Sequence, residues 1–219
     1  SRLGATRSDV LVHASLGEDS AVIDFGDWVC VVSTDPITGA ARNAGWLSVH
    51  ISCNDVAANG AEPVGVLPTL LLPEGTTAEG IRRTMAEIDA AASELGVEVL
   101  GGHTEITPGL ANMIISTTAI GKARKHAYVT SAGARPGDDI LMSKYAGLEG
   151  TSILASDLAA VLEPRVGPAT LARARELIRQ ISVVREGLLA ARRGATALHD
   201  TTEGGVLGAL YEMAEASQI

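Results

Sequence analysis

Short apolar runs alternate with amphipathic stretches along the first two thirds of the chain. Strands are expected where an apolar run is bounded by glycine, proline or aspartate, at residues 21–25, 28–33, 64–72, 98–100, 112–120 and 139–143. Gly26 and Asp27 separate the first two runs, which predicts a hairpin. Helices are expected at 45–59 and 76–95, so strands and helices alternate. This order predicts an α/β fold.

The two expected helices differ in how their apolar residues are distributed. Segment 45–59 is apolar on most sides, which predicts a buried helix that ends at Asn59-Gly60. In segment 76–95, Thr76 and Glu79 have the spacing of a capping box, and an apolar stripe follows. The stripe consists of Ile81, Met85, Ile88, Ala92 and Leu95. We expect its opposite, charged face to be solvated.

The pattern changes near residues 145–150, where we expect a boundary between domains 1–145 and 146–219. Helices are then expected at 148–162, 169–180 and 183–193, followed by a short strand at 196–198 and a helix from Gly205. A strand–helix unit needs a second strand to bury its face, and none follows this last helix. The second α/β domain is therefore expected to be incomplete in this chain.

Composition narrows the class of partner. Of the 219 residues, 46% are apolar and only 3% aromatic, so the core must be built from Ala, Val, Ile and Leu. The formal net charge is -9 and no basic stretch exists, which argues against a nucleic-acid partner. An acidic protein that binds phosphates needs helix N-termini, glycine loops or bridging cations.

The targeting signals expected of exported or membrane proteins are not found, and the cysteines lie in apolar runs, which together predict a soluble, cytoplasmic protein. The chain shows no signal-like start and no apolar run long enough to span a bilayer. Cys30 and Cys53 lie in apolar runs without metal-ligand spacing, so they are interpreted as small core residues in a reducing compartment. A disulfide between them is the minor alternative.

Four motifs place acidic or small residues at strand ends or beside a helix. They are GEDSAVI from Gly17, STDP from Ser33, NDVAANGA from Asn54 and GGHTE from Gly101. Asp55 follows Leu47 and Ile51 at helical spacing, inside the helix that is apolar nearly all round. A carboxylate there must be neutralised by a proton, a base or a metal. Mg²⁺ bound to a nucleotide uses such hard oxygen ligands, and it would let an acidic protein hold ATP.

Each motif alone also has an ordinary structural interpretation. Asp19 is compatible with a turn or a cap, Asp35 with the turn that ends a strand, and Asp55 with a buried acceptor that binds no metal. Gly101-Gly102 is compatible with a tight turn and His103 with an exposed loop. The motifs therefore carry a functional argument only together.

Together, the motifs match one superfamily in order, spacing and neighbouring residues. GEDSAV, STD, NDVAANGAEP and GGHTE are followed by HDTTEGG at residues 199–205. Over residues 17–217 the chain resembles the superfamily of aminoimidazole ribonucleotide (AIR) synthetase, hydrogenase maturation factor HypE, thiamine-monophosphate kinase, selenophosphate synthetase and formylglycinamidine synthase. The NDVA and GGHTE motifs are its most specific features.

The resemblance implies a PurM-like α/β (α+β) fold and a nucleotide site. The first domain would hold a four-stranded sheet backed by helices, and two copies would form an eight-stranded barrel in a homodimer. Mg²⁺ would bridge the phosphates of ATP to Asp19, Asp35 and Asp55. The resemblance also assigns Asn54, Asp200 and the loop of Gly101, Gly102, His103, Thr104 and Glu105 to the nucleotide site. The terminal phosphate would move to an amide-like oxygen or a small substrate.

Departures from the family pattern favour one branch. Glu18-Asp19 replaces the usual Asp-Asp pair, which makes Asp19 the better candidate ligand, and segment 144–150 is less glycine-rich than the family's linker. HDTTEGG is closest to HypE, which uses ATP to dehydrate a carbamoylated C-terminal cysteine. The acceptor would then be a protein C-terminal amide-type group or a small molecule. Two alternatives stay open: a nucleotide-binding dimerisation module without activity of its own, and a small-metabolite kinase of the thiamine-monophosphate kinase type.

Overall fold

One mixed sheet organises the first half of the chain. The computed structural model describes residues 4–13, 15, 17–38, 40 and 42–219. Within them, four long strands lie side by side and antiparallel, in the order β2 (Ala21–Phe25), β3 (Trp28–Ile37), β7 (Ile114–Arg124) and β4 (Glu62–Leu72). Three short strands extend the sheet: β1 (Val10–Val12) beside β2, and β5 (Glu98–Val99) and β6 (His103–Ile106), both parallel to β4. The expected fold class and β2–β3 hairpin are confirmed.

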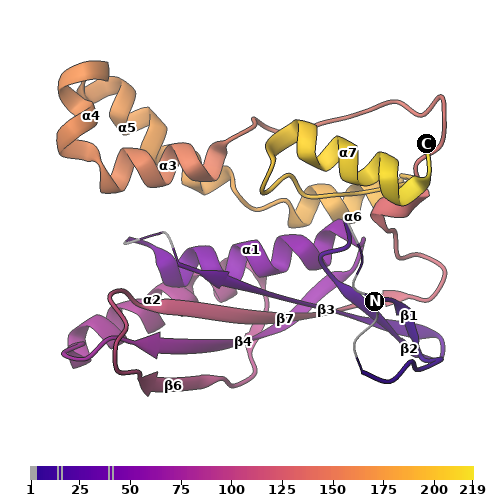
Figure 1. Cartoon of the computed structure of the whole chain (residues 1–219), viewed down its shortest axis with the longest axis horizontal. Coiled ribbons are helices and arrows are strands. Elements are labelled where there is room, and N and C mark those ends of the chain that lie inside the picture. The colour runs from indigo at the N-terminus through magenta and orange to yellow at the C-terminus, as the bar shows by residue number, and fades with distance from the viewer. Residues whose placement is uncertain (1–3, 14, 16, 39, 41) are drawn as a thin grey trace.

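Helix α1 (Ala44–Ala58) is the centre of the molecule. One side of it packs on β3, β4 and β7, while the other meets α6 (Val184–Arg192), and α2 (Ala78–Leu95) lies alongside it (Figure 1). Nearly every residue of α1 is therefore buried, as its apolar composition predicts. The core between helix and sheet includes Leu47, Val56, Val31 and Ile115, all without exposed surface.

The second half of the chain lies across α1 from the sheet (Figure 1). It contains α3 (Leu148–Asp157), α4 (Ala159–Val166), α5 (Pro168–Glu176), α6 and α7 (Gly205–Ser217), together with short 3-10 turns at Ser131–Gly133 and Leu177–Gln180. Helices α4 and α5 are farthest from the sheet, while α7 packs on the Ser131–Gly133 turn. Gly187 allows α6 to approach α1, because a Cβ there would lie 2.3 Å from the Ala57 carbonyl oxygen.

Two expected strands in the second half are absent. Residues 139–143 and 196–198 are irregular, and Leu141 is 90% exposed. A strand needs a neighbour to satisfy its backbone groups, and the described chain supplies none for 139–143. Segment 196–198 instead runs beside the turn at Ser131–Gly133, where the Leu198 amide donates to the Thr130 carbonyl.

Several expected helix and strand limits also differ. Segment 148–162 divides into α3 and α4 at Leu158, and 169–180 ends in a 3-10 turn. The α2 cap is Thr77, which accepts from the Gly80 amide, while the Thr76 hydroxyl bonds the Pro73 carbonyl, so the Thr76–Glu79 capping box is wrong. Strand β3 continues through Asp35 to Ile37, because β7 pairs with it that far. The GGHTE segment is largely strand β6 rather than a loop.

The face of the sheet opposite α1 carries half-buried apolar side chains. They are Val32, Leu67, Leu71, Ile114 and Ile120, and strand register places them on one side. No helix of the described chain covers this face in Figure 1. Both cysteines are free, and among the described residues no helix is at once long and apolar enough to cross a bilayer.

Candidate functional site

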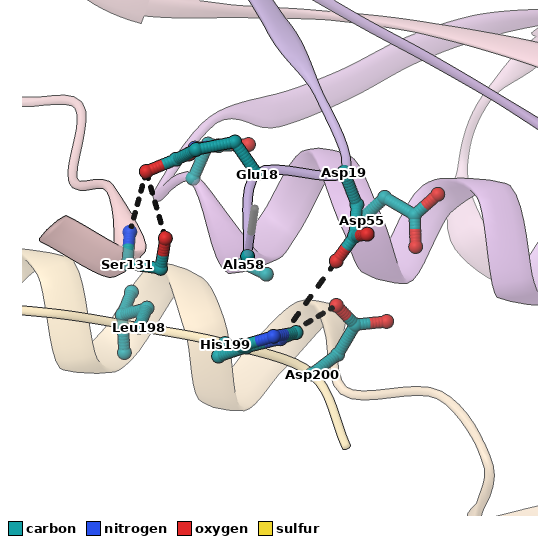
Figure 2. Close-up of a pocket in the computed structure, with 10 residues that line it drawn as sticks. Glu18, Asp19, Asp55, Ala58, Ser131, Leu198, His199 and Asp200 are labelled. Atoms are coloured by element: carbon teal, nitrogen blue, oxygen red, sulfur yellow. Dashed lines mark hydrogen bonds and ion pairs between the residues drawn. The ribbon is translucent and has the colours of Figure 1, made fainter. Parts of the chain in front are cut away.

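Four carboxylates from separate parts of the chain converge at one site. Asp19 precedes β2, Asp35 lies on β3, Asp55 on the last turn of α1, and Asp200 in the loop before α7. The β2–β3 hairpin brings Asp19 and Asp35 to the same end of the sheet, because Ala21 pairs with Val32. Figure 2 shows Asp19, Asp55 and Asp200 around a small pocket that His199 also lines.

Ser33 fixes two of these segments. Its hydroxyl lies 2.6 Å from Asp55 Oδ2 and 2.9 Å from the carbonyl oxygen of Asp19. Only 2% of Asp55 is exposed. Burial, followed by the charges of Asp200 and Asp35, raises the pKa of Asp55 to about 10. Without a cation, this carboxyl group is therefore protonated at neutral pH.

Asp35 and Asp19 are perturbed in the same direction. Burial is the largest cause for each, and the charge of Asp200 also raises the pKa of both carboxyl groups. Because these neighbouring acids repel one another when ionised, they indicate a site that a bound positive charge would stabilise.

His199 lies among the acids. Its Nε2 is 2.7 Å from Glu212 Oε2 on α7, and its Nδ1 is 3.7 Å from Asp19 Oδ2 and 3.9 Å from Asp200 Oδ1. The imidazole is almost fully buried. Asp200, then Glu212 and Asp19, raise the pKa of His199 to about 9 against the opposing effect of burial. Without a cation, the protonated ring of His199 thus supplies a positive charge among the acids.

The residues present fit a divalent cation. Asp200 has a side chain only 7% exposed, and its Oδ1 has no hydrogen-bond partner in the described chain. One ligand atom each from Asp19, His199 and Asp200 lie within 4.8 Å of one another. A buried carboxylate oxygen without a donor is costly unless an ion or water satisfies it.

Glu18, the neighbour of Asp19, has a different environment. Its Oε1 accepts from the Ser131 amide at 3.2 Å and from the Ser131 hydroxyl at 2.7 Å. It thereby ties the segment before β2 to the turn beneath α7 (Figure 2). Asp19 is accordingly the member of the pair that faces the other acids.

Asn54, another predicted site residue, joins the two halves of the chain. Its side-chain amide donates to the Ile181 carbonyl at 3.0 Å, and its Oδ1 accepts from the Val183 amide at 2.8 Å. These bonds hold the segment before α6 against α1. Both polar atoms of the Asn54 side chain are thus bonded to backbone groups. Its predicted contact with a nucleotide stays a prediction.

The GGHTE residues lie elsewhere in the sheet. His103 to Ile106 form β6, and β7 and β4 separate it from β3, a distance of about 14 Å at the usual strand spacing. His103 Nε2 lies 3.0 Å from Glu105 Oε2, and both side chains are exposed. Position 102 requires glycine because its backbone lies against β4, where a Cβ would be 2.1 Å from the Pro68 carbonyl oxygen. The structure therefore gathers Asp19, Asp35, Asp55 and Asp200, but not residues 101–105.

Sequence reasoning missed two participants. His199 begins the HDTTEGG motif but was not a candidate site residue, and Glu212 lies outside every motif. The only sequence signal for His199 was its place beside Asp200. Glu212 had none, because its approach to His199 depends on how α7 packs.

Comparisons with known proteins identify the family of the chain. The N-terminal domain model of AIR synthase related protein matches residues 17–123, and its C-terminal domain model matches residues 135–219. The chain belongs to the AIR synthase related protein family. The two matches leave residues 124–134 between them, and the domain boundary expected near residue 145 stays a prediction.

Individual relatives and structures give the same result. Carbamoyl dehydratase HypE of Cupriavidus necator is 31% identical over 196 residues, which are 86% of this chain and 54% of that protein. The chain thus spans just over half the length of this relative. A crystal structure of hydrogenase maturation protein HypE superposes with a TM-score of 0.68 at 28% identity, covering 91% of this chain and 62% of that one. The structure of AaThiL complexed with AMPPCP and TMP has a TM-score of 0.78 at 22% identity, covering 92% and 65%.

Proposed function

We propose that this chain is the nucleotide-binding part of a cytoplasmic ATP-dependent enzyme of the AIR synthase and HypE type. It binds Mg-ATP and phosphorylates an amide-like oxygen, or a small substrate, for dehydration or ring closure. The observation that carries the proposal is the convergence of Asp19, Asp35, Asp55 and Asp200, together with a buried oxygen of Asp200 that accepts no hydrogen bond in the described chain.

Charge explains why such a site suits a nucleotide. The chain is acidic overall, so phosphates approach the carboxylates only if cations stand between them. Bound Mg²⁺ would coordinate carboxylates, water and phosphate oxygens at the same time. It would thereby neutralise the charge between the protein and the phosphates. Asp19, Asp35 and Asp55 are the proposed ligands, and Asp200 faces the same space. AaThiL, which has the same fold, was solved in complex with the ATP analogue AMPPCP, and this supports ATP as the proposed ligand.

The chain's own contribution to transfer is positioning and charge balance. Ser33 holds Asp55 and the segment of Asp19 together, and Glu18 with Ser131 closes the same region. Such fixed groups keep a phosphate in line with its acceptor and need no reorganisation during transfer. In the step itself, the acceptor oxygen bonds the γ-phosphorus while the bond to the ADP oxygen breaks. Later loss of inorganic phosphate removes the amide oxygen.

The quaternary structure is part of the proposal. The uncovered sheet face with Val32, Leu67 and Ile120 supports a homodimer in which two sheets close into an eight-stranded barrel. Residues 101–105 remain proposed nucleotide-site residues; three of them, His103, Thr104 and Glu105, belong to β6 of this sheet.

Product analysis tests the activity. Full-length protein is incubated with Mg-ATP and a peptide ending in a carbamoylated cysteine, and products are followed by ADP formation and mass spectrometry. The proposal predicts ADP, inorganic phosphate and a peptide that has lost one water. A peptide that retains a phosphate would instead indicate a kinase. Absence of ADP formation, with intact nucleotide binding, would leave only the binding and dimerisation module.

A further inference from the structure

His199 presents one ring nitrogen to the acids and the other to Glu212. The Nε2–Glu212 contact at 2.7 Å is the shortest of its ion-pair distances, and Nδ1 lies nearest Asp19 and Asp200 (Figure 2). Only 3% of the His199 side chain is exposed to solvent. The cluster of acids therefore contains a nitrogen atom that solvent barely reaches.

Glu212 decides which nitrogen is available. A carboxylate only accepts hydrogen bonds, so Nε2 must carry the proton in the 2.7 Å contact. A cation that binds His199 must therefore displace the proton on Nδ1, and the lone pair it uncovers lies on the side of Asp19 and Asp200. Carboxylate-to-histidine contacts of this kind orient histidines that bind metals.

The three candidate ligand atoms leave room for one ion. Nδ1 is 3.7 Å from Asp19 Oδ2 and 3.9 Å from Asp200 Oδ1. Two ligands at about 2.1 Å from a shared cation lie between about 3.0 and 4.2 Å apart, depending on the angle. Both measured separations fall within that interval, and Asp200 Oδ1 has no other partner in the described chain.

Packing holds Glu212 at this position. Gly17, with φ +77°, lies against its backbone, and a Cβ on Gly17 would be 3.2 Å from Glu212 Cβ. Farther along α7, the Ser217 hydroxyl bonds the Ser131 carbonyl and accepts from the Ala134 amide. Helix α7 is therefore held at Glu212 by the segment that precedes Asp19, and at Ser217 by the turn whose Ser131 also bonds Glu18.

We propose that one cation of this site is held by nitrogen as well as oxygen, through His199 Nδ1, Asp19 and Asp200, with Glu212 as the residue that positions the imidazole. The inference rests on the proposed divalent-cation site and adds a nitrogen ligand to its aspartates. A nitrogen ligand favours first-row transition ions over Mg²⁺, which prefers oxygen alone, and Mn²⁺ is the ion of that series that also accepts the carboxylates of this site. The site is therefore expected to bind Mn²⁺ more tightly than Mg²⁺.

Manganese spectroscopy tests this directly. Full-length protein is titrated with Mn²⁺, with and without AMPPCP, and free Mn²⁺ is measured by electron paramagnetic resonance. Pulsed measurements on the bound ion then detect coupling to ¹⁴N of a coordinated imidazole. We expect that coupling in the wild type and its loss in His199→Gln, with Mn²⁺ affinity at least tenfold weaker. Glu212→Gln should weaken Mn²⁺ binding about tenfold, as other orienting residues do.

The controls separate this inference from the proposed function. Glu215→Gln lies one turn farther along α7 on an exposed position and should match the wild type. Mn²⁺ bound without imidazole coupling, or with coupling that survives His199→Gln, would overturn the nitrogen ligand but leave the nucleotide site standing. Absence of Mn²⁺ binding, even with AMPPCP, would overturn the proposed cation site itself. Thermal unfolding of each variant shows that it is folded.

Discussion

Ser33 and Asp55 are joined by a hydrogen bond of 2.6 Å between β3 and α1. The same hydroxyl lies 2.9 Å from the Asp19 carbonyl, so one small side chain connects three segments that carry acids. Neither contact is local in sequence, since 22 residues separate Ser33 from Asp55. The geometry of the acidic site thus depends on how the sheet packs against α1.

Removing this hydroxyl should loosen the site. We expect Ser33→Ala to lower the free energy of unfolding by about 1–3 kcal/mol, because a buried polar group loses its partner. Urea denaturation measures the change. Ser116→Ala, on the uncovered face of β7, is the matched control and should stay within about 0.5 kcal/mol of the wild type. Equal stability of both variants would show that the bond contributes nothing.

Asp55→Asn should stabilise the metal-free protein at alkaline pH. The pKa of Asp55 is raised from 3.8 to about 10, so the folded state holds a proton that the unfolded state releases. Stability from this group is complete below pH 3.8 and is lost as the pH rises through 10. In chelator-treated samples, the asparagine variant should therefore melt at a higher temperature than the wild type at pH 8. A lower melting temperature, with Asp89→Asn on α2 unchanged, would contradict the assigned protonation.

His50 should make the fold sensitive to acid. Burial lowers the pKa of His50, while Glu94 on α2, 3.3 Å from Nε2, raises it and Lys144 lowers it further. Because the net shift is downward, stability is complete above the unfolded value of 6.5 and is lost as the pH falls through the folded value. We expect His50→Gln to flatten the stability profile below pH 6.5. His126→Gln, at an exposed position, should leave it unchanged; identical profiles for all three proteins would refute the effect.

Gly187 should be essential to the contact between α6 and α1. Gly187→Ala places a Cβ 2.3 Å from the Ala57 carbonyl oxygen, which requires the helices to separate. Overpacking of this kind costs about 1–3 kcal/mol. Gly150→Ala is the matched control, because no atom lies within 4 Å of its Cβ and helix propensity favours alanine. A variant at 187 as stable as the control would mean that α6 does not pack as observed.

The uncovered sheet face should mediate self-association. Val32→Lys and Ile120→Lys, which are paired neighbours on β3 and β7, place charges on that face. We expect a dimer for the wild type and a monomer for each variant in sedimentation at micromolar concentration. Ala90→Lys, exposed on α2, should remain dimeric. A monomeric wild type would remove the proposed barrel.

Local pattern predicted most of the first half of the fold. The buried helix around Asp55, the β2–β3 hairpin and the sheet strands follow from periodicity and turn residues, and are found. The prediction of strands at 139–143 and 196–198 was wrong, because a strand depends on a neighbouring strand that periodicity does not show. The acids were identified from their motifs. Glu212 was not, because its contact with His199 depends on tertiary packing alone.

Isothermal titration with AMPPCP, with and without Mg²⁺, tests the central claim most directly. The account predicts binding that requires Mg²⁺, and at least tenfold weaker affinity in Asp55→Asn, a loss of roughly 1.4 kcal/mol. Asp89→Asn should bind as the wild type does. Magnesium-independent binding, or equal affinity in a folded Asp55→Asn variant, would contradict the assignment of the acids to a nucleotide-bound cation.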